Sequence, residues 1–302
     1  MIHSDFVVSA EDVKKAGKRL KGVVTHTPLL CSIELDRHTG ARVFVKPECL
    51  QKSGSFKFRG AYNRISQLSE AEKKMGVVAF SSGNHGQGIA LAAKMEGLKA
   101  TIVMPEDAPK IKIEKTYSHG ATIVFYDRYK ENREEISQAI CNKNGGTLIP
   151  AYDDKYIISG QGTGALEACQ DIKAMGLSFD SYLSPIGGGG LMAGSNLIIK
   201  DFSPDTKTYC VEPNGYDDHR KSFEAGTRLG NEKTPPFSSC DSLLCPIPGE
   251  LTFPINYNFI EEGLVVSETE IEDAIRFAFD NLKVVSEPGG VVALAAILSG
   301  KI

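Results

Sequence analysis

The sequence lacks several features that would mark particular classes of protein. Its seven cysteines include no CxxC pair, so neither a disulfide framework nor a zinc cluster is indicated, and we expect reduced thiols that are mostly buried. The longest apolar run, Val291–Leu298, is too short to span a bilayer, and the N-terminal stretch MIHSDFVVSAEDVKKAGK contains no apolar signal core. We therefore expect a soluble, cytoplasmic protein.

Long runs of one charge are also missing. Lys plus Arg (34) against Asp plus Glu (38) gives a net charge of −4, which makes nucleic acid and anionic membranes poor candidate partners and favours a small-molecule ligand. The 302 residues suffice for one large or two moderate domains, each with its own core. No internal repeat is visible, and five prolines predict that Thr234–Pro254 is mostly loop.

What the sequence does contain is an alternation of short Val- and Ile-rich runs with helical periods. From Gly76 onward, GVVAF, KATIVMP, ATIVFY and GTLIP predict strands, and GIALAAKMEG, KIKIEKTYSHG and ENREEISQAICNKN predict the intervening helices. After a break, the pattern resumes with GTGALEACQDIKAMG, SYLSPI, LMAGSNLIIKDF, KTYCVEP and YDDHRKSFEAG. This predicts an α/β protein with two layered units, the first inserted into the second. Ligands of such sheets bind beyond the carboxyl ends of the strands.

Four consecutive glycines, Gly187 to Gly190, follow the predicted strand SYLSPI and precede a helix. Without Cβ atoms, successive backbone N–H groups can turn toward one anion, and the helix N-terminus adds partial positive charge. A phosphate cup is one interpretation, and a tight strand-to-helix corner is the other. The loop lacks the lysine and Ser/Thr of a Walker A motif and does not match GxGxxG, so neither nucleotide hydrolysis nor dinucleotide binding is indicated.

Two further segments carry candidate chemistry. SSGNHGQG, Ser81 to Gly88, follows VVAF; it contains ordinary helix caps, but its glycines also suit a site that binds a substrate carboxylate. In GSFKFRGAYN, Lys57 stands between two phenylalanines where a helix begins. An isolated lysine of this kind usually snorkels from an apolar patch. Beside a phosphate cup, a desolvated lysine with a lowered pKa suggests pyridoxal phosphate.

The motifs SGSFKFRGAYN, SSGNHGQGIALAAK, YDDKYIISGQGTGALE, PIGGGGLMAGS and SEPGGVVALAAILSGK, in this order, closely resemble the pyridoxal-phosphate-dependent serine/threonine dehydratase and serine racemase family. The resemblance runs from Thr25 to the end of the chain. It implies the tryptophan-synthase-β-like fold, fold type II, with residues 1–70 and 148–302 in a large cofactor-binding domain and residues 71–147 in a smaller substrate-closing domain. It also implies a homodimer or higher homo-oligomer.

The resemblance assigns roles to the motif residues. Lys57 would form the Schiff base with the cofactor, and Phe56 would pack near its ring. Asn84 would bond the ring hydroxyl, while Gly187, Gly188, Gly189, Gly190 and Leu191 would hold the phosphate. Ser81, Ser82, Gly83 and His85 would surround the substrate carboxylate. Ser82 matches the serine that serves racemases of this family as the base on the face opposite the lysine.

A divalent cation is implied by the segment VEPNGYDDHR. Glu212 and Asp218 match the acidic pair that binds a cation in serine racemases and related hydroxyaspartate dehydratases, with the Tyr216 carbonyl as a third ligand. Oxygen ligands suit Mg²⁺, Ca²⁺ or Mn²⁺. The alternative is a helix whose first-turn acids favour its dipole without metal. Arg133 falls near a carboxylate-binding arginine of the racemase, although we expect an exposed arginine on a solvated helix.

The resemblance implies a lyase that eliminates water from L-threonine or L-serine and releases a 2-oxo acid and ammonia. Serine racemisation and threo-3-hydroxyaspartate dehydration use the same residues and stay open, and an inactive ligand sensor or scaffold is the non-enzymatic alternative. The family's SGGN-like segment, whose serine bonds the pyridine nitrogen, is absent from a chain that stops at LSGKI. Either that segment lies beyond the sequence given, which we expect, or another group bonds the pyridine nitrogen.

Overall fold

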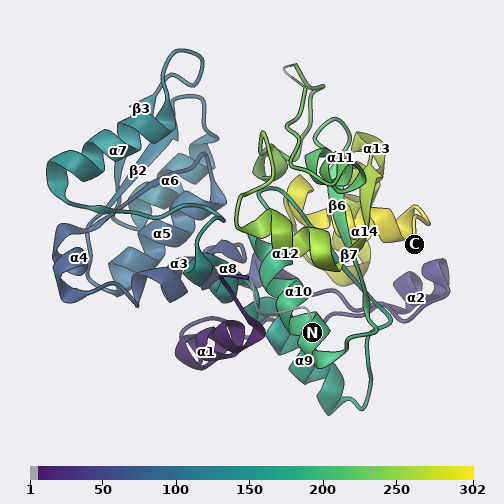
Figure 1. Cartoon of the computed structure of the whole chain (residues 1–302). Helices are drawn as coiled ribbons and strands as arrows, with labels where there is room; N and C mark the ends of the chain where they lie inside the picture. Colours follow the sequence, from purple (N-terminus) through teal and green to yellow (C-terminus); the bar gives the residue numbers. More distant parts are fainter. Residues whose placement is uncertain (1–5, 233) are drawn as a thin grey trace.

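The computed structural model describes residues 6–232 and 234–302, so the first five residues of the expected large domain lie outside the described part. Two wholly parallel sheets organise the chain (Figure 1). The four-stranded sheet has the order β3-β2-β1-β4, with β1 (Val77–Phe80), β2 (Ala100–Pro105), β3 (Thr122–Tyr126) and β4 (Thr147–Leu148). The three-stranded sheet has the order β5-β6-β7, with β5 (Ser181–Pro185), β6 (Lys207–Pro213) and β7 (Ile260–Val266). The predicted α/β class is confirmed.

Helices surround each sheet and form two lobes. The first lobe, residues 70–148, carries α4 (Glu70–Met75), α5 (Asn84–Met95), α6 (Lys110–Ser118) and α7 (Arg133–Asn144). The second lobe, residues 181–302, carries α10 (Gly190–Phe202), α11 (Asp218–Ala225), α12 (Thr252–Phe259), α13 (Glu268–Phe277), the π-helical turn η3 (Ala278–Leu282) and α14 (Pro288–Leu298). Each lobe has its own core of buried aliphatic side chains, so each sheet is stabilised separately.

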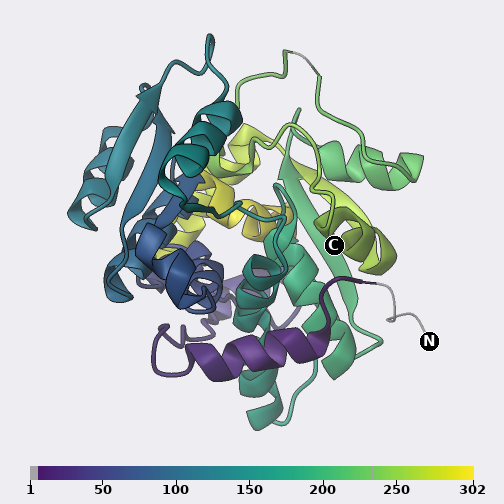
Figure 2. The same ribbon diagram turned by 60° about the vertical axis from the view of Figure 1, so that its left-hand side comes forward.

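The remaining helices lie between or beside the lobes (Figures 1 and 2). They are α1 (Ala10–Leu20), α2 (Ile33–Thr39), the 3₁₀ turn η1 (Glu48–Leu50), α3 (Lys57–Ile65), α8 (Lys155–Gln161) and α9 (Thr163–Ala174). Glycines let two of these helices, α3 and α8, and α10 of the second lobe touch along their backbones. A Cβ on Gly160 would lie 2.6 Å from the Gly60 Cα, and one on Gly194 would lie 2.3 Å from the Ile158 carbonyl oxygen. The α3–α8–α10 stack therefore fixes Lys57, at the start of α3, relative to the glycine loop that precedes α10.

A buried ion network fixes the same end of α3. The Arg59 side chain is fully buried, and its guanidinium donates to Glu48 at 2.7 and 2.8 Å and to Glu167 at 2.7 and 2.9 Å. Bidentate pairs of this kind define position as well as charge balance. Removing either carboxylate would leave part of the buried guanidinium unpaired, which is a costly defect in a protein interior.

Several local predictions can be checked directly. All seven cysteines are free, and four of them, Cys141, Cys169, Cys210 and Cys240, are buried, as expected. Thr234–Pro254 is mostly loop, apart from the 3₁₀ turn η2 (Asp241–Leu243) and the first turn of α12, where Pro254 is tolerated because no helical partner for its N–H is needed. The predicted strand GTLIP shortens to two residues, since β4 is an edge strand that pairs with β1 alone.

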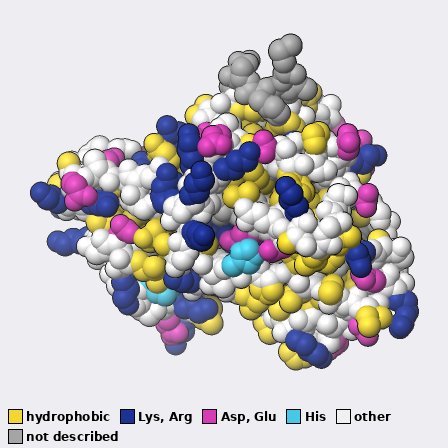
Figure 3. Space-filling view, turned by 90° about the horizontal axis from the view of Figure 1, so that it is seen from below, with side chains coloured by type: hydrophobic (Ala, Val, Ile, Leu, Met, Phe, Trp, Pro, Cys, Tyr) yellow, Lys and Arg dark blue, Asp and Glu magenta, His cyan; other side chains and the backbone are white. Residues whose placement is uncertain are grey.

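Charges are mixed over the surface. On the face seen in Figure 3, lysine and arginine side chains are interspersed with acidic ones. Within the residues that the structure describes, no helix combines the length and apolar character needed to cross a membrane.

Candidate active site

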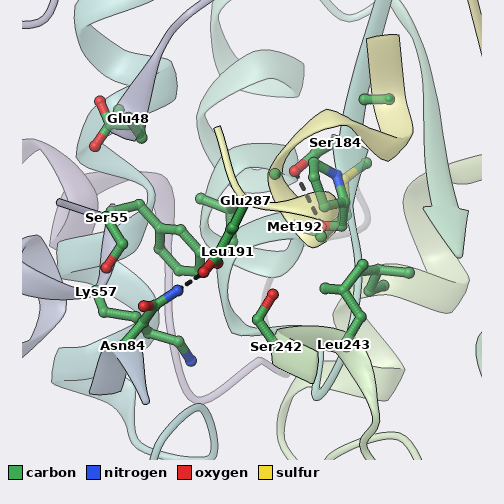
Figure 4. A pocket seen from close by; sticks show the side chains of 18 of the residues that line it. Glu48, Ser55, Lys57, Asn84, Ser184, Leu191, Met192, Ser242, Leu243 and Glu287 are labelled. Atoms are coloured by element: carbon green, nitrogen blue, oxygen red, sulfur yellow. Dashed lines mark hydrogen bonds between the residues drawn. The ribbon is translucent and has the colours of Figure 1, made fainter. Parts of the chain in front are cut away.

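A cavity of about 1890 Å³ lies where the carboxyl ends of both sheets face each other. Its walls include the start of α3, the loop from β1 to α5, the glycine loop before α10, Tyr152, η2 and the residues before α14. Figure 4 shows Lys57, Asn84, Leu191 and Glu287 around this space. The cavity therefore collects the segments that the sequence marked at strand ends, although they are far apart along the chain.

Lys57 is the first residue of α3 and lines the cavity. Burial lowers the pKa of its amine to about 8, and the Nζ atom donates a hydrogen bond to the Ala151 carbonyl at 2.9 Å. The two flanking phenylalanines differ in their surroundings: Phe58 is fully buried in the core of the first lobe, whereas the Phe56 ring lies in the cavity wall, with its centroid 5.3 Å from Nζ. The apolar neighbours thus produce an amine that loses its proton readily.

The segment Ser81 to His85 forms the cavity wall after β1. The Gly83 N–H donates to the Ser81 hydroxyl at 3.1 Å, and Asn84 begins α5, so Ser82 lies in a tight turn that faces the cavity. Burial lowers the pKa of His85 to about 3, which keeps the imidazole neutral. Its Nε2–H donates to the Ile149 carbonyl at 3.0 Å, while the buried Nδ1 has no partner among the described residues.

The glycine loop has the geometry of an anion site. Gly187, Gly188 and Gly189 turn their carbonyl oxygens toward His219, Thr252 and Asn256, which donate at 2.8, 2.6 and 3.1 Å. With the carbonyl groups occupied on one side of the loop, the N-terminus of α10 at Gly190 lines the cavity, where its partial positive charge favours an anion. Gly189 has a φ of 93°, and a Cβ on Gly188 would lie 2.2 Å from the Tyr152 ring.

Glu212 and Asp218 lie behind the glycine loop. Glu212 ends β6 and accepts hydrogen bonds from the backbone N–H groups of His219 and Arg220, both at 2.9 Å. Burial, and then the charge of Asp218, raise the pKa of Glu212 well above its usual range, and burial raises the pKa of Asp218 to about 7. The Asp218 Oδ2 atom is buried without a partner among the described residues.

Tyr216 lies two residues before Asp218, in the turn that connects β6 to α11. The described residues contain no group of three or more His, Cys, Asp or Glu side chains that could hold a metal ion. A cation here would need backbone or water oxygens in addition to the two carboxylates.

Arg133 differs from its sequence-based expectation. It is only half-buried, it lines the cavity, and its guanidinium lies over the Phe80 ring at 5.0 Å from the centroid. The expectation of an exposed arginine on a solvated helix was wrong because α7 packs against the sheet and buries Ser137 and Cys141, and Arg133 at its start reaches the Phe80 ring of β1. Tyr152, Cys245, Lys112 and Glu287 also line the cavity. Tyr152 and Glu287 lie in motifs of the resemblance but had no role assigned, and Cys245 and Lys112 lie in none of those motifs.

The residues fit pyridoxal phosphate. The glycine loop offers a cradle that a Cβ would fill, Lys57 offers an amine of low pKa, and His85 offers an unpaired acceptor beside them. An anionic cofactor that reacts with an amine matches this combination.

Comparison with known proteins agrees with this fit. The family described as pyridoxal-phosphate dependent enzyme matches residues 20–302. The chain is 44% identical over 289 residues to an L-threo-3-hydroxyaspartate ammonia-lyase of Pseudomonas sp, covering 96% of this chain and 89% of the relative. It is 40% identical to an L-threonine ammonia-lyase of Thermotoga maritima, covering 97% and 72%. The structure of maize serine racemase superposes with a TM-score of 0.93 at 36% identity, covering 98% of this chain and 88% of the other.

Proposed function

The chain belongs to the family of pyridoxal-phosphate dependent enzymes, and on that premise we propose that it is an L-threonine/L-serine ammonia-lyase. The observation that carries the proposal is the buried Lys57 amine in the same cavity as the glycine cradle. The reaction removes the Cα proton and the β-hydroxyl of the substrate, and hydrolysis of the product gives a 2-oxo acid and ammonia. Relatives named as ammonia-lyases support an enzyme over the inactive scaffold.

When bound, pyridoxal phosphate supplies an electron sink for the bond that breaks at Cα. Gly187 to Gly190 with Leu191 would hold its phosphate, Phe56 would pack at its ring, and Asn84 would bond its hydroxyl. Lys57 would hold the cofactor and then, as a neutral amine, take the proton from Cα. Its pKa of about 8 leaves a useful unprotonated fraction close to neutral pH.

The loop from Ser81 to His85 would orient the substrate carboxylate. The Gly83 and Asn84 backbone lies at the N-terminus of α5, where negative charge is favoured. Neutral His85 adds no competing charge, so the carboxylate would be held by dipoles and hydroxyls. This fixes Cα relative to Lys57, and fixed geometry is what makes a weak carbon acid react. Serine racemisation would add Ser82 as a second base, and the release of D-serine would reveal it.

A divalent cation, Mg²⁺, Mn²⁺ or Ca²⁺, is part of the proposal. The support is chemical: Glu212 and Asp218 are buried close together, and both are disfavoured as anions there. A cation bound by these carboxylates and the Tyr216 carbonyl would supply the missing positive charge. We also propose a cytoplasmic location and a homo-oligomeric state.

L-threo-3-hydroxyaspartate is the second candidate substrate. Arg133 places a guanidinium in the cavity wall, where it could pair with a side-chain carboxylate that threonine and serine lack. The 44% identical relative bears the name of this activity. The decision between the candidates rests on relative kcat/KM values, because one cavity can admit all three substrates.

The test is a parallel assay of the purified protein loaded with pyridoxal phosphate. L-threonine, L-serine and L-threo-3-hydroxyaspartate are added separately, and 2-oxo acid, ammonia and D-serine are measured with Mg²⁺ and with a chelator. The proposal expects 2-oxo acid and ammonia from L-threonine or L-serine. A protein that binds the cofactor but converts none of the three would contradict it.

A further inference from the structure

Three charged side chains of the cavity wall, Lys112, Asp241 and Glu287, form a cluster and have no role in the function proposed above. The Lys112 Nζ lies 2.7 Å from an Asp241 carboxylate oxygen and 3.5 Å from a Glu287 carboxylate oxygen. The Lys112 side chain is only 14% exposed, against 39% for Asp241 and 32% for Glu287. Lys112 is therefore held inside the cavity wall by two acids, unlike most lysines.

The cluster joins the two lobes. Lys112 belongs to α6 of the first lobe, whereas Asp241 starts η2 and Glu287 precedes α14, both in the second lobe. Between described residues of 70–148 and 181–302, the hydrogen bonds and ion pairs all involve Lys112 or Asn84. The two sheets do not share one core, so these polar contacts join the facing walls directly across the cavity, in addition to the α3–α8–α10 stack.

Glu287 connects Lys112 to Asn84. One Glu287 oxygen faces Lys112, and the other accepts a hydrogen bond from the Asn84 Nδ2 at 2.5 Å, drawn as a dashed line in Figure 4. Lys112 also covers the turn before Asn84, since a Cβ on Gly83 would lie 2.9 Å from Nζ. The lysine thus touches both the acceptor of the Asn84 amide and the turn that presents it.

We propose that Lys112 is a positioning residue that ties α6 to Asp241 and Glu287 and thereby sets how the two walls of the cavity face each other and how Asn84 is oriented. Without its charge, two carboxylates would face each other with no cation between them, and Glu287 would turn toward water. Asn84 would then lose its acceptor. The inference rests on the proposed function only for its kinetic readout.

Lys110 provides the matched comparison on the same helix. Its side chain is 90% exposed and lies 3.8 Å from Glu114, which is itself 63% exposed. Such surface pairs contribute little, so Lys110→Met should leave the protein unchanged. Lys112→Met removes the charge and keeps the length of the side chain, Lys112→Arg keeps the charge, and Asp241→Asn removes one partner.

The experiment measures hydrogen exchange of the cofactor-loaded protein in peptides that cover 81–90 and 284–290. We expect exchange in both peptides to rise by about tenfold in Lys112→Met, with other peptides unchanged, and to return close to the parent rate in Lys112→Arg. In steady-state assays, kcat/KM should fall by about tenfold in Lys112→Met and Asp241→Asn and stay constant in Lys110→Met.

Two outcomes would overturn the proposal. In the first, hydrogen exchange in the two peptides is the same in Lys112→Met as in Lys110→Met. In the second, hydrogen exchange in Lys112→Met rises over the whole chain and Lys112→Arg does not restore the parent rate, which would mean a general loss of stability. If Lys112→Met does not fold, Asp241→Asn decides by the same exchange measurement. Exchange and cofactor binding can be followed even if no substrate is converted, so failure of this inference is distinguishable from failure of the proposed function.

Discussion

At the scale of single residues, the chemistry depends on where one lysine is placed. Among the described residues, no acidic side chain accepts a hydrogen bond from Lys57. Its Nζ atom donates instead to the backbone carbonyl of Ala151. Burial without a hydrogen-bonded carboxylate disfavours the charged ammonium form, so the proton equilibrium shifts toward the neutral amine. The lowered pKa of about 8 follows from this burial.

The cofactor-free protein should therefore contain one unusually reactive amine. We expect the rate of Lys57 modification by trinitrobenzenesulfonate to rise with pH around a midpoint near 8, whereas exposed lysines follow the ordinary value of 10.5. The pKa of Lys57 is lower in the folded protein than in the unfolded chain, so between pH 8 and 10.5 the unfolded chain binds more protons. The free energy of unfolding should therefore increase as pH rises from about 8 to 10.5. Lys57→Met should lack that increase. A labelling midpoint near that of surface lysines would contradict the account.

Arg133 gives a prediction about selectivity. Arg133→Met should lower kcat/KM for L-threo-3-hydroxyaspartate by about a hundredfold, because a charge-assisted pair with the side-chain carboxylate is lost. The value for L-threonine should change less than about threefold. Lys130→Met is the control, since that lysine is 81% exposed and pairs with Asp127. Equal losses for both substrates would assign Arg133 a general structural role.

At the scale of elements, the site is built from strand ends and helix starts. The glycine loop works because its carbonyl groups are occupied by His219, Thr252 and Asn256 on the side away from the cavity. His219 comes from α11, and the other two come from α12, so two helices of the second lobe support one turn of backbone. This support explains how four glycines can be ordered without side chains of their own.

Substitution in the loop should weaken cofactor binding. Gly188→Ala would place a methyl group 2.2 Å from the Tyr152 ring, so the ring or the loop must move. We expect the Kd for pyridoxal phosphate, measured by equilibrium dialysis, to rise at least about tenfold. Gly164→Ala is the control, because its nearest neighbour would lie at an ordinary 3.7 Å. Unchanged binding in Gly188→Ala would argue against the loop as the phosphate site.

The β6–α11 connection gives a prediction about cations. Saturating Mg²⁺, Mn²⁺ or Ca²⁺ should raise the thermal midpoint by several degrees, which corresponds to about 2–3 kcal/mol at a hundred times the Kd. Asp218→Asn should remove most of this response. Asp217→Asn should keep it, since Asp217 is already paired with Arg220 and Lys221. A thermal midpoint that does not change with any of the three cations would contradict the proposed cation site.

How much the sequence could predict also differs between elements. Strands β1 to β3 and the loops after β1 and β5 were predictable because Val- and Ile-rich runs and glycine clusters are local signals. The strand β4 was predicted as well, but its length of two residues was not, since pairing at a sheet edge is a tertiary property. Arg133 was misjudged because the ring beneath it, Phe80, belongs to another element.

The Lys112–Asp241 pair illustrates the same limit over a longer distance. The two residues are 129 positions apart, and each is an ordinary surface type when read alone. The sequence contains no periodicity that relates an α6 lysine to η2. Only the arrangement of the two lobes brings them together. The contact of Lys112 with Glu287 could therefore not be inferred from any motif.

At the scale of the whole molecule, the cavity exists because two separately folded lobes meet around the α3–α8–α10 stack. The stack fixes the distance between Lys57 and the glycine loop. The loop after β1 and Lys112 line the first-lobe side of the cavity, and Asp241 and Glu287 line the second-lobe side.

The most direct test of the central claim is the stoichiometry of L-threonine turnover by the cofactor-loaded protein, measured beside Lys57→Ala. We predict equal amounts of 2-oxobutanoate and ammonia from the parent protein and a loss of at least about a thousandfold in Lys57→Ala, because that variant lacks the amine that we propose removes the Cα proton. Turnover that survives in Lys57→Ala, or ammonia released without 2-oxo acid, would contradict the account.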